Sequence, residues 1–380
     1  MSAVYLEHRV LVWMGLAHLI CGGAALAWMG RPWPIRLTSG WLPLLWVVSS
    51  LLWLFWQYLR HPRRVRAILS AERVMGAILV LLLIEPLQIT FQALKQSIGP
   101  VVGFPLDPWL SRADLLLHGT APWRLYARLL PDWSWVAAID VLYLCWGFAV
   151  IGFLFWASWS HVRPLRQRAL VAFLLLAIGG ATLGAWAGAS AGPCYYEFVT
   201  PPTASNPYDE LLARLDAVGS GQEELFARTM QRGLWDVQVR DQPATFSGVS
   251  AMPSLHVGNA VLLALIAWRR SKIAGVLMTG YAVVIQIGSV VLAWHYAIDG
   301  YVGAMLAVGS WIGAGMLLGQ GRTLPSPRAT AGGSRPRTPC AGPPRLNDAR
   351  LGKAGRGVGD RPADPRIPEV ELTTQVGSPG

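Results

Sequence analysis

Long apolar runs separated by short polar segments dominate the first 320 residues of the chain. An apolar run of about 20 residues is long enough to cross a bilayer as a helix. We identify eight candidate runs, at residues 10–29, 41–59, 74–94, 135–157, 168–190, 256–272, 273–294 and 296–318. The pattern predicts an all-α, polytopic membrane protein with about eight transmembrane helices.

Positive residues between the apolar runs predict the orientation of the chain. Segment 60–73 holds five arginines, segment 158–168 holds three, and segment 269–272 reads RRSK. Short loops rich in Lys and Arg stay in the cytoplasm. These three segments alternate correctly along the chain, so the loops between them face the opposite, extracytoplasmic side. We expect an integral membrane protein of a bacterial inner membrane.

Composition agrees with this assignment. The chain is 53% hydrophobic and 14% charged, whereas soluble domains carry about 25% charged residues. A net charge of +11 would favour a nucleic-acid partner in a soluble chain, but these charges lie in the short loops and the tail, so no nucleic acid is expected. The four cysteines show no CxxC spacing, which gives no support for a zinc site or a disulfide framework.

The same patterns divide the chain into three parts. Residues 1–73 form N-terminal transmembrane helices, and residues 74–318 form the main membrane domain. Residues 319–380 are rich in Gly, Pro, Arg and Ser and lack apolar periodicity, which predicts a disordered cytoplasmic tail. The first 29 residues could instead be a signal peptide cleaved after Ala27, but the run is long and its start weakly basic, so we favour a retained helix.

The long extracytoplasmic loop, 195–246, contains YDELLARLDAV and EELFARTMQRGLW. Both stretches place apolar residues at helical spacing. They predict two short helices that lie on the membrane surface or cap the site, although an ordinary structured loop fits the pattern as well.

Two histidines stand at the extracytoplasmic ends of adjacent apolar runs, in AMPSLHVGNA (251–260) and HYAIDG (295–300). A short basic turn joins the two runs, so they must be antiparallel, which places His256 and His295 at similar depth. Asp299 follows His295 by four residues, on the same face if this stretch is helical. A carboxylate there can hold the imidazole Nδ1–H and leave Nε2 free as a nucleophile.

Ser254 completes this group. A serine is a preferred N-cap, so Ser250 and Ser254 can each cap the start of the helix that contains His256, with Pro253 in its first turn, and the N–H groups of a helix N-terminus attract anions. A phosphate could therefore sit between Ser254 and the two histidines. Three ionisable groups at one membrane depth are costly unless they are used, which favours a catalytic site.

Other interpretations stay open. Two histidines and one aspartate could bind zinc or iron, but Asp299 is better placed as a partner of His295, so we expect no metal and no cofactor. A transporter or lipid-binding protein could keep the group as an anion site, although we find no internal repeat. A metal-dependent oxidoreductase would require more histidines at the same place.

The paired motifs resemble a known family. AMPSLH followed by HYAIDGYVG is similar to the second and third signature motifs of the type 2 phosphatidic acid phosphatase superfamily. The form PSLH with HYxxDxxxG is most similar to the branch that contains inositol phosphorylceramide synthases, as are residues 91–123 and 191–197. The resemblance covers residues 74–318 and implies the core helical bundle of that superfamily.

The resemblance also implies roles for the site residues. His295 would attack phosphorus and form a phosphohistidine, and Asp299 would orient it. His256 would act as general acid and base, and Ser254 would hold a phosphate oxygen. The expected enzyme is a lipid phosphatase or phosphotransferase acting on phosphatidate- or phosphatidylinositol-type lipids, including an inositolphosphotransferase-like activity.

The sequence departs from the superfamily in its positive charges. Ser289 stands where phosphatases carry an arginine six residues before the nucleophile, and the first motif, a lysine followed by Arg-Pro, is absent. The positive charge that offsets a phosphoryl transition state must therefore come from elsewhere. Lys95 and Arg112, in or beside the extracytoplasmic loop 95–134, are candidate phosphate-binding residues, although each also fits an ordinary interfacial charge.

Overall fold

A computed structural model describes residues 3–32, 41–61, 65, 68–202, 205–220, 224–241 and 248–320. All of them belong to one compact unit, Met1–Leu324. Within these residues every regular element is a helix. The predicted disordered tail lies outside the described residues from position 321 onward.

All eight apolar runs form helices, but only six of these helices, among the described residues, are long and apolar enough to cross a membrane. The six spans are His8–Trp28, Arg73–Val102, Trp135–Trp159, Arg163–Ala187, Lys272–Val291 and Ala297–Leu317. Leu44–Arg60 and Leu255–Trp268 are shorter apolar helices. The run predicted at 256–272 stops early because Arg269 and Arg270 follow it on an exposed turn.

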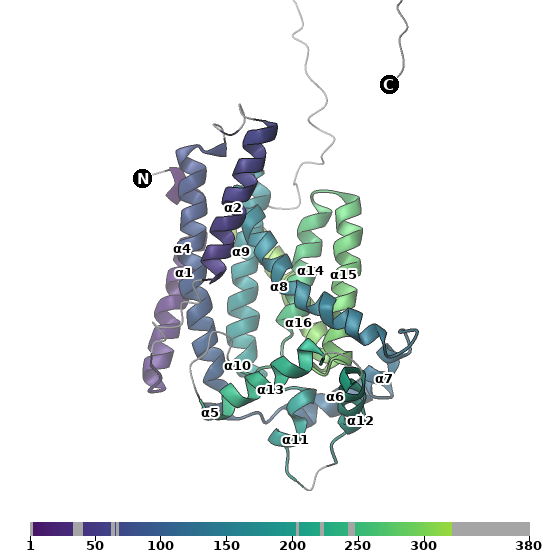
Figure 1. The fold of residues 1–380 in the computed structure, drawn as a ribbon. Helices are drawn as coiled ribbons and strands as arrows, with labels where there is room; N and C mark the ends of the chain where they lie inside the picture. The colour runs from purple at the N-terminus through teal and green to yellow at the C-terminus, as the bar shows by residue number, and fades with distance from the viewer. Residues whose placement is uncertain are drawn as a thin grey trace, which may run out of the picture. The chain divides into compact units, whose positions relative to one another are not determined.

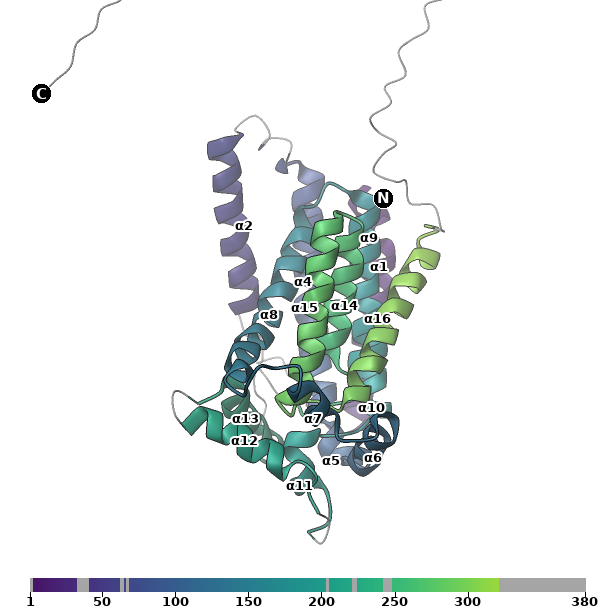
Figure 2. The same ribbon diagram turned by 90° about the vertical axis from the view of Figure 1, so that its right-hand side faces the viewer.

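The long helices form a bundle (Figures 1 and 2). Their bounds are α1 (Ala3–Trp28), α2 (Trp41–Arg60), α4 (Ala71–Gln96), α8 (Trp135–Trp159), α9 (Arg163–Leu176), α14 (Leu255–Trp268), α15 (Lys272–Val291) and α16 (Ala297–Leu317). Helix α14 packs mainly against α15 and α16, and α16 also packs against α9. Helices α1 and α4 pack against each other on the other side.

Short helices gather at one end of this bundle, opposite to the α14–α15 turn (Figures 1 and 2). They are α5 (Ile98–Val102), α6 (Asp107–His118), α7 (Pro122–Ala127), η2 (Pro193–Tyr195), α11 (Tyr196–Val199), α12 (Asp209–Ser220) and α13 (Phe226–Val239). Helices α12 and α13 match the two segments predicted as helical in the long loop. We call this end the short-helix end.

The span that contains α9 changes its winding as it nears the short-helix end. After α9 the chain forms a π-helical stretch, η1 (Ala177–Gly184), and one last turn, α10 (Ala185–Ala187). Small residues here admit the segment before α14: a Cβ at Gly184 would lie 3.0 Å from Cδ of Pro253, and one at Gly188 would lie 2.6 Å from Cγ of Met252. The segment that carries the first histidine motif therefore packs against the end of the π-helical stretch and the residues that follow it.

Helices α14 and α16 touch through their backbones at the same end. A Cβ at Gly303 would lie only 2.2 Å from the carbonyl oxygen of Ser254, and one at Gly258 would lie 3.0 Å from the carbonyl oxygen of Gly303. Small residues allow such close approach between membrane helices. This contact fixes the start of α14 against α16, and both histidine motifs lie there.

We predict that Gly303→Ala weakens this contact. The added methyl overlaps the Ser254 carbonyl, and overpacking of this kind costs about 1–3 kcal/mol. Gly309→Ala is the matched control because it lies on the same helix with no atom within 4 Å of the added Cβ. Thermal unfolding in detergent should show a lower melting temperature for the first variant only; equal melting temperatures would contradict the contact.

Candidate active site

The two histidine motifs meet at the short-helix end. His256 is the second residue of α14, and His295 lies in the connection between α15 and α16. Their ring centroids are 6.0 Å apart and the rings are inclined by 58°. The antiparallel arrangement of the two helices therefore brings the N-terminal end of α14 and the C-terminal end of α15, and with them the two imidazoles, to the same end of the pair.

The sequence predicts an apolar span at 273–294 followed directly by a second span at 296–318. In the structure the two helices are further apart, and His295 lies on neither of them. Helix α15 ends at Val291 and α16 begins at Ala297. The backbone N–H groups of Trp294 and His295 both donate to the carbonyl of Ser289, at 3.0 and 2.9 Å. The chain thus turns sharply before His295, because the carbonyl of Ser289 accepts both N–H groups that would otherwise continue the helix.

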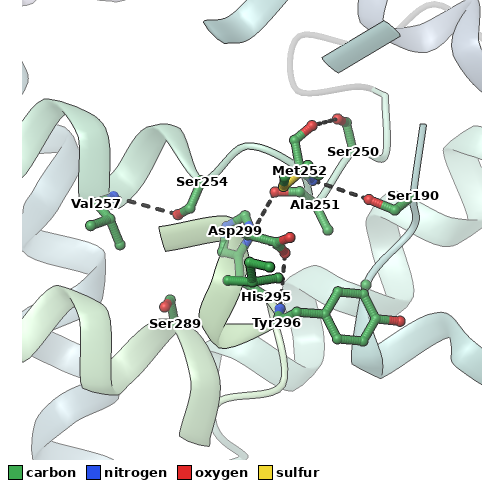
Figure 3. Close-up of polar contacts among 12 residues, drawn as sticks. Ser190, Ser250, Ala251, Met252, Ser254, Val257, Ser289, His295, Tyr296 and Asp299 are labelled. Atoms are coloured by element: carbon green, nitrogen blue, oxygen red, sulfur yellow. Dashed lines mark hydrogen bonds and ion pairs between the residues drawn. The ribbon is translucent and has the colours of Figure 1, made fainter. Parts of the chain in front are cut away.

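Asp299 is nevertheless close to His295. Its Oδ2 atom accepts a hydrogen bond from the N–H of Tyr296 at 2.9 Å and lies 3.5 Å from His295 Nδ1. The stronger contact of Nδ1 is with the carbonyl oxygen of Ala251, at 2.8 Å (Figure 3). Asp299 therefore shares Nδ1 with a backbone carbonyl, whereas the sequence predicted Asp299 as its one partner.

This arrangement sets the tautomer of His295. A carbonyl oxygen only accepts hydrogen bonds, so Nδ1 must carry the proton, and the lone pair of the neutral ring is then on Nε2. In the part of the chain that the structure describes, Nε2 has no hydrogen-bond partner. The ring is buried and held at one nitrogen with the other available for chemistry.

Ser254, one of the two serines that the sequence offers as caps, is the N-cap of α14, and Pro253 lies before the helix and not in its first turn. Its Oγ accepts from the N–H of Val257 at 3.4 Å, and its own N–H donates to the Asp299 carbonyl at 3.0 Å. The segment before it is fixed as well: the N–H groups of Ala251 and Met252 donate to Ser190, at 2.8 and 3.1 Å (Figure 3). The start of α14 is thus tied to both α16 and the segment after α10.

His256 is held by aromatic rings. Its ring stacks on Tyr143 at a centroid distance of 4.6 Å and packs against Trp146 at 4.2 Å. Neither ring nitrogen makes a hydrogen bond among the described residues, which leaves both free to exchange a proton with a ligand. Sequence reasoning missed this pair; the available signal was two aromatic residues at i and i+3, which share one helix face.

The two candidate positive charges differ in position. Lys95, in the last turn of α4, is half-buried and close enough to His256 for their charges to interact. Gly248, with φ +80°, lets the segment before α14 lie against it, because a Cβ there would be 3.0 Å from Lys95 Cγ. Arg112 is exposed on α6 and makes no contact with the histidines that the structure records. The structure thus places Lys95 near His256, and a phosphate-binding role for either residue stays a prediction.

Two aspartates on α6, which sequence reasoning missed, anchor the backbone around the site. The carboxylate of Asp107 accepts from the N–H groups of Ala191 and Gly192 and from Tyr296 Oη, each at 2.8 Å. Asp114 accepts from the first N–H groups of α16, those of Ala297 and Ile298, at 2.7 and 3.0 Å. Two acids seven residues apart on an otherwise apolar helix face were the available signal.

Burial raises the pKa of Asp107 to about 6, although the hydrogen bonds from Ala191, Gly192 and Tyr296 lower it. Burial likewise raises the pKa of Asp114 to about 6, opposed by the bonds from Ala297 and Ile298. Both groups are therefore ionised at neutral pH, in the form that accepts all of these hydrogen bonds. A negative charge at the start of α16 also stabilises the helix dipole.

Metal binding was the competing interpretation of the histidines. Within the described ranges, no group of three or more His, Cys, Asp or Glu side chains is arranged to hold a metal ion. The side chains at the site can instead supply one nucleophilic nitrogen, one proton carrier and one positive charge.

Comparison with known proteins gives one result. The sequence matches the PAP2 superfamily over residues 108–313, which is more than half of the chain. The match includes His256, His295 and Asp299 and begins after Lys95. Neither the curated proteins nor the solved structures contain a significant match.

We predict that Asp114→Asn destabilises the site end of α16. A carboxamide has one accepting oxygen, and its NH₂ group would face a backbone N–H, which leaves a buried donor unpaired at a cost of about 1–3 kcal/mol. Asp236→Asn is the control because Asp236 is exposed on α13. The melting temperature in detergent should fall for Asp114→Asn alone, and an unchanged value would show that Asp114 does not hold α16.

Proposed function

Because the chain belongs to the PAP2 superfamily, whose members are generally phosphatases or phosphotransferases, we propose that it cleaves or transfers the phospho-headgroup of a membrane lipid through a phosphohistidine on His295. One observation carries the proposal: His295 Nδ1 is bound to the Ala251 carbonyl and Nε2 is left without a partner among the described residues, beside the ring of His256.

In the first step, the Nε2 lone pair of His295 attacks the phosphorus of the lipid. The bond between phosphorus and the lipid's oxygen breaks, and protonated His256 donates its proton to that leaving oxygen. The imidazolium that forms on His295 lies 3.5 Å from the Asp299 carboxylate, measured from Nδ1 to Oδ2. This negative charge stabilises the intermediate electrostatically.

In the second step, neutral His256 removes the proton of an acceptor hydroxyl. The acceptor oxygen attacks phosphorus, the phosphorus–nitrogen bond breaks, and His295 returns to its starting state. Water as acceptor makes the enzyme a phosphatase, and a lipid hydroxyl makes it a phosphotransferase. An inositolphosphotransferase-like activity on phosphatidylinositol is one form of the second case.

Two features supply a place for the phosphoryl oxygens. The N-terminus of α14, with Ser254 as its cap, directs backbone N–H groups and a partial positive charge toward an anion. Lys95 interacts electrostatically with His256 and makes no ion pair among the described residues. Its ammonium group would offset the charge that develops on the transferred phosphoryl group.

The position of the site supports the extracytoplasmic leaflet as the source of the lipid. The histidines lie at the short-helix end, whereas the basic turn 269–272 lies at the other end of the α14–α15 pair. Basic loops stay in the cytoplasm. The site would therefore face the extracytoplasmic side, within the integral membrane part of the chain.

We predict that His295→Asn abolishes turnover, with a loss of about 1000-fold or more, because the variant lacks the nucleophilic nitrogen. Purified wild type in detergent with EDTA should release phosphate from phosphatidate, or transfer the headgroup of phosphatidylinositol to ceramide or diacylglycerol. A labelled headgroup should remain on wild-type protein as an acid-labile adduct, His295→Asn should carry none, and His256→Asn should slow both formation and loss of the adduct. Activity that EDTA removes and a metal restores would contradict the mechanism.

We predict that Lys95→Met lowers kcat by about 100-fold, which is the typical effect of removing one group that stabilises transition-state charge. Lys95→Arg should retain more activity because it keeps the charge. Arg112→Met is the comparison variant because Arg112 is the other candidate phosphate-binding residue and its side chain is exposed. Steady-state kinetics on the same lipid would compare kcat for the two variants. Equal losses of kcat would contradict a specific role of Lys95 in binding the phosphate.

A further inference from the structure

Helix α13 crosses the short-helix end and carries two glutamines that no step of the mechanism uses. Gln231 and Gln238 are both buried, 1% and 6% exposed, although the helix belongs to a polar loop. They are seven residues apart, which places them on one face of the helix two turns from each other. A long polar side chain is rarely buried unless its hydrogen bonds are satisfied.

Gln238 joins two segments of the site. Its Nε2 donates to the carbonyl of Gln96 at 3.3 Å, and its Oε1 accepts from the N–H of Val249 at 3.0 Å. Gln96 directly follows Lys95 at the end of α4, and Val249 begins the segment that leads to Ser254 and His256. One side chain thus connects the segment of the candidate phosphate-binding lysine to the segment of the general acid and base.

The space for this side chain is narrow. A Cβ at Gly99, in α5, would lie 2.5 Å from Gln238 Nε2. On the other side, a Cβ at Gly248 would lie 2.7 Å from the backbone nitrogen of Gln96. The Gln238 amide therefore packs closely against α5, and the segment before α14 packs closely against the end of α4.

Gln231 reaches the third segment of the site. Its Nε2 donates to the carbonyl of Leu292 at 2.8 Å, in the connection that carries His295. Its Oε1 accepts from Arg228 Nη1 at 2.9 Å, and its backbone carbonyl accepts from Tyr195 Oη at 2.8 Å. Both polar atoms of the Gln231 side chain, Nε2 and Oε1, therefore make hydrogen bonds.

The helix itself is fixed to the bundle independently of the two glutamines. Asp140, on α8, accepts from the N–H of Ala227 in the first turn of α13, at 3.1 and 3.4 Å to its two oxygens. Helix α8 also carries Tyr143 and Trp146, which pack against His256. One end of α13 is thus anchored to the same helix that holds the His256 ring.

We propose that α13 is a brace in which Gln231 and Gln238 set the distances among Lys95, His256 and His295. This inference rests on the function proposed above, and the two glutamines are positioning residues that act through the backbone segments they hold. Misplacing a reacting group by about 1 Å can cost about 100-fold in rate. Loss of either amide should therefore lower kcat while binding of the lipid changes little.

The test uses Gln231→Met and Gln238→Met in the full-length protein in detergent. Methionine has nearly the same shape as glutamine and removes its hydrogen bonds. Asp236→Met is the control because it lies on the exposed face of the same helix. Turnover of phosphatidate and phosphatidylinositol, melting temperature, and amide hydrogen exchange of segments 248–254 and 290–296 are measured for each variant.

We expect kcat to fall by about 10- to 100-fold in both glutamine variants, with KM changed by less than about threefold. Exchange should rise in segment 248–254 for Gln238→Met and in segment 290–296 for Gln231→Met. The control should match wild type in every measurement. Gly99→Ala, which crowds Gln238 without changing it, should reproduce Gln238→Met, whereas Gly233→Ala, with no atom within 4 Å of its Cβ, should not.

Unchanged exchange in both segments would overturn the brace, and raised exchange with unchanged kcat would overturn its positioning role. A wild type that turns over no lipid would instead overturn the proposed function, and the exchange measurements would then still decide whether α13 holds the two segments. If a methionine variant does not fold, the Gly99→Ala and Gly233→Ala pair decides the question by the same criteria.

Discussion

The hydrogen bond between His295 Nδ1 and the carbonyl of Ala251 joins the two histidine motifs into one site. It determines which nitrogen of the neutral His295 ring carries the proton and which carries the lone pair, and it depends on Ala251 being held in place. That demand explains the contacts around it: Ser190 binds the backbone of Ala251 and Met252, and Gly303 lets α16 approach the Ser254 carbonyl. A small displacement of either helix would break the bond and release the ring.

The carboxylates of α6 and the amides of α13 meet a second demand, which is that the polar backbone at this end of the bundle be paired. The segment before α14 and the connection that bears His295 are irregular, so their N–H and carbonyl groups lack the partners that a helix provides. Asp107, Asp114, Gln231 and Gln238 supply those partners. The short helices therefore supply hydrogen-bond partners to the backbone of the turns around the site, where no regular helix provides them.

A few buried polar side-chain atoms at the site have no hydrogen-bond partner among the described residues. Asp299 Oδ1, Tyr143 Oη and Trp146 Nε1 are buried with no hydrogen bond in the described part of the chain, and Lys95 has no ion pair there. All four are at or next to the two imidazoles. Trp294 Nε1, in the residue before His295, is also buried without a partner among the described residues, so these are the atoms that a ligand bound beside the imidazoles could engage.

The apolar runs, a serine cap before His256 and the two helices of the long loop were predictable from the sequence, because each depends on local hydropathy or spacing. The meeting of His256 and His295 was also predictable, since a short turn forces two adjacent spans to be antiparallel. Several features were decided by the tertiary structure alone: the turn before His295, the Ala251 carbonyl as its partner, the position of Lys95 near His256, and the anchors Asp107 and Asp114. The physical reason is that every residue has the same backbone carbonyl and N–H, so a partner made from the backbone leaves no signature in the sequence and is chosen only when distant segments pack together.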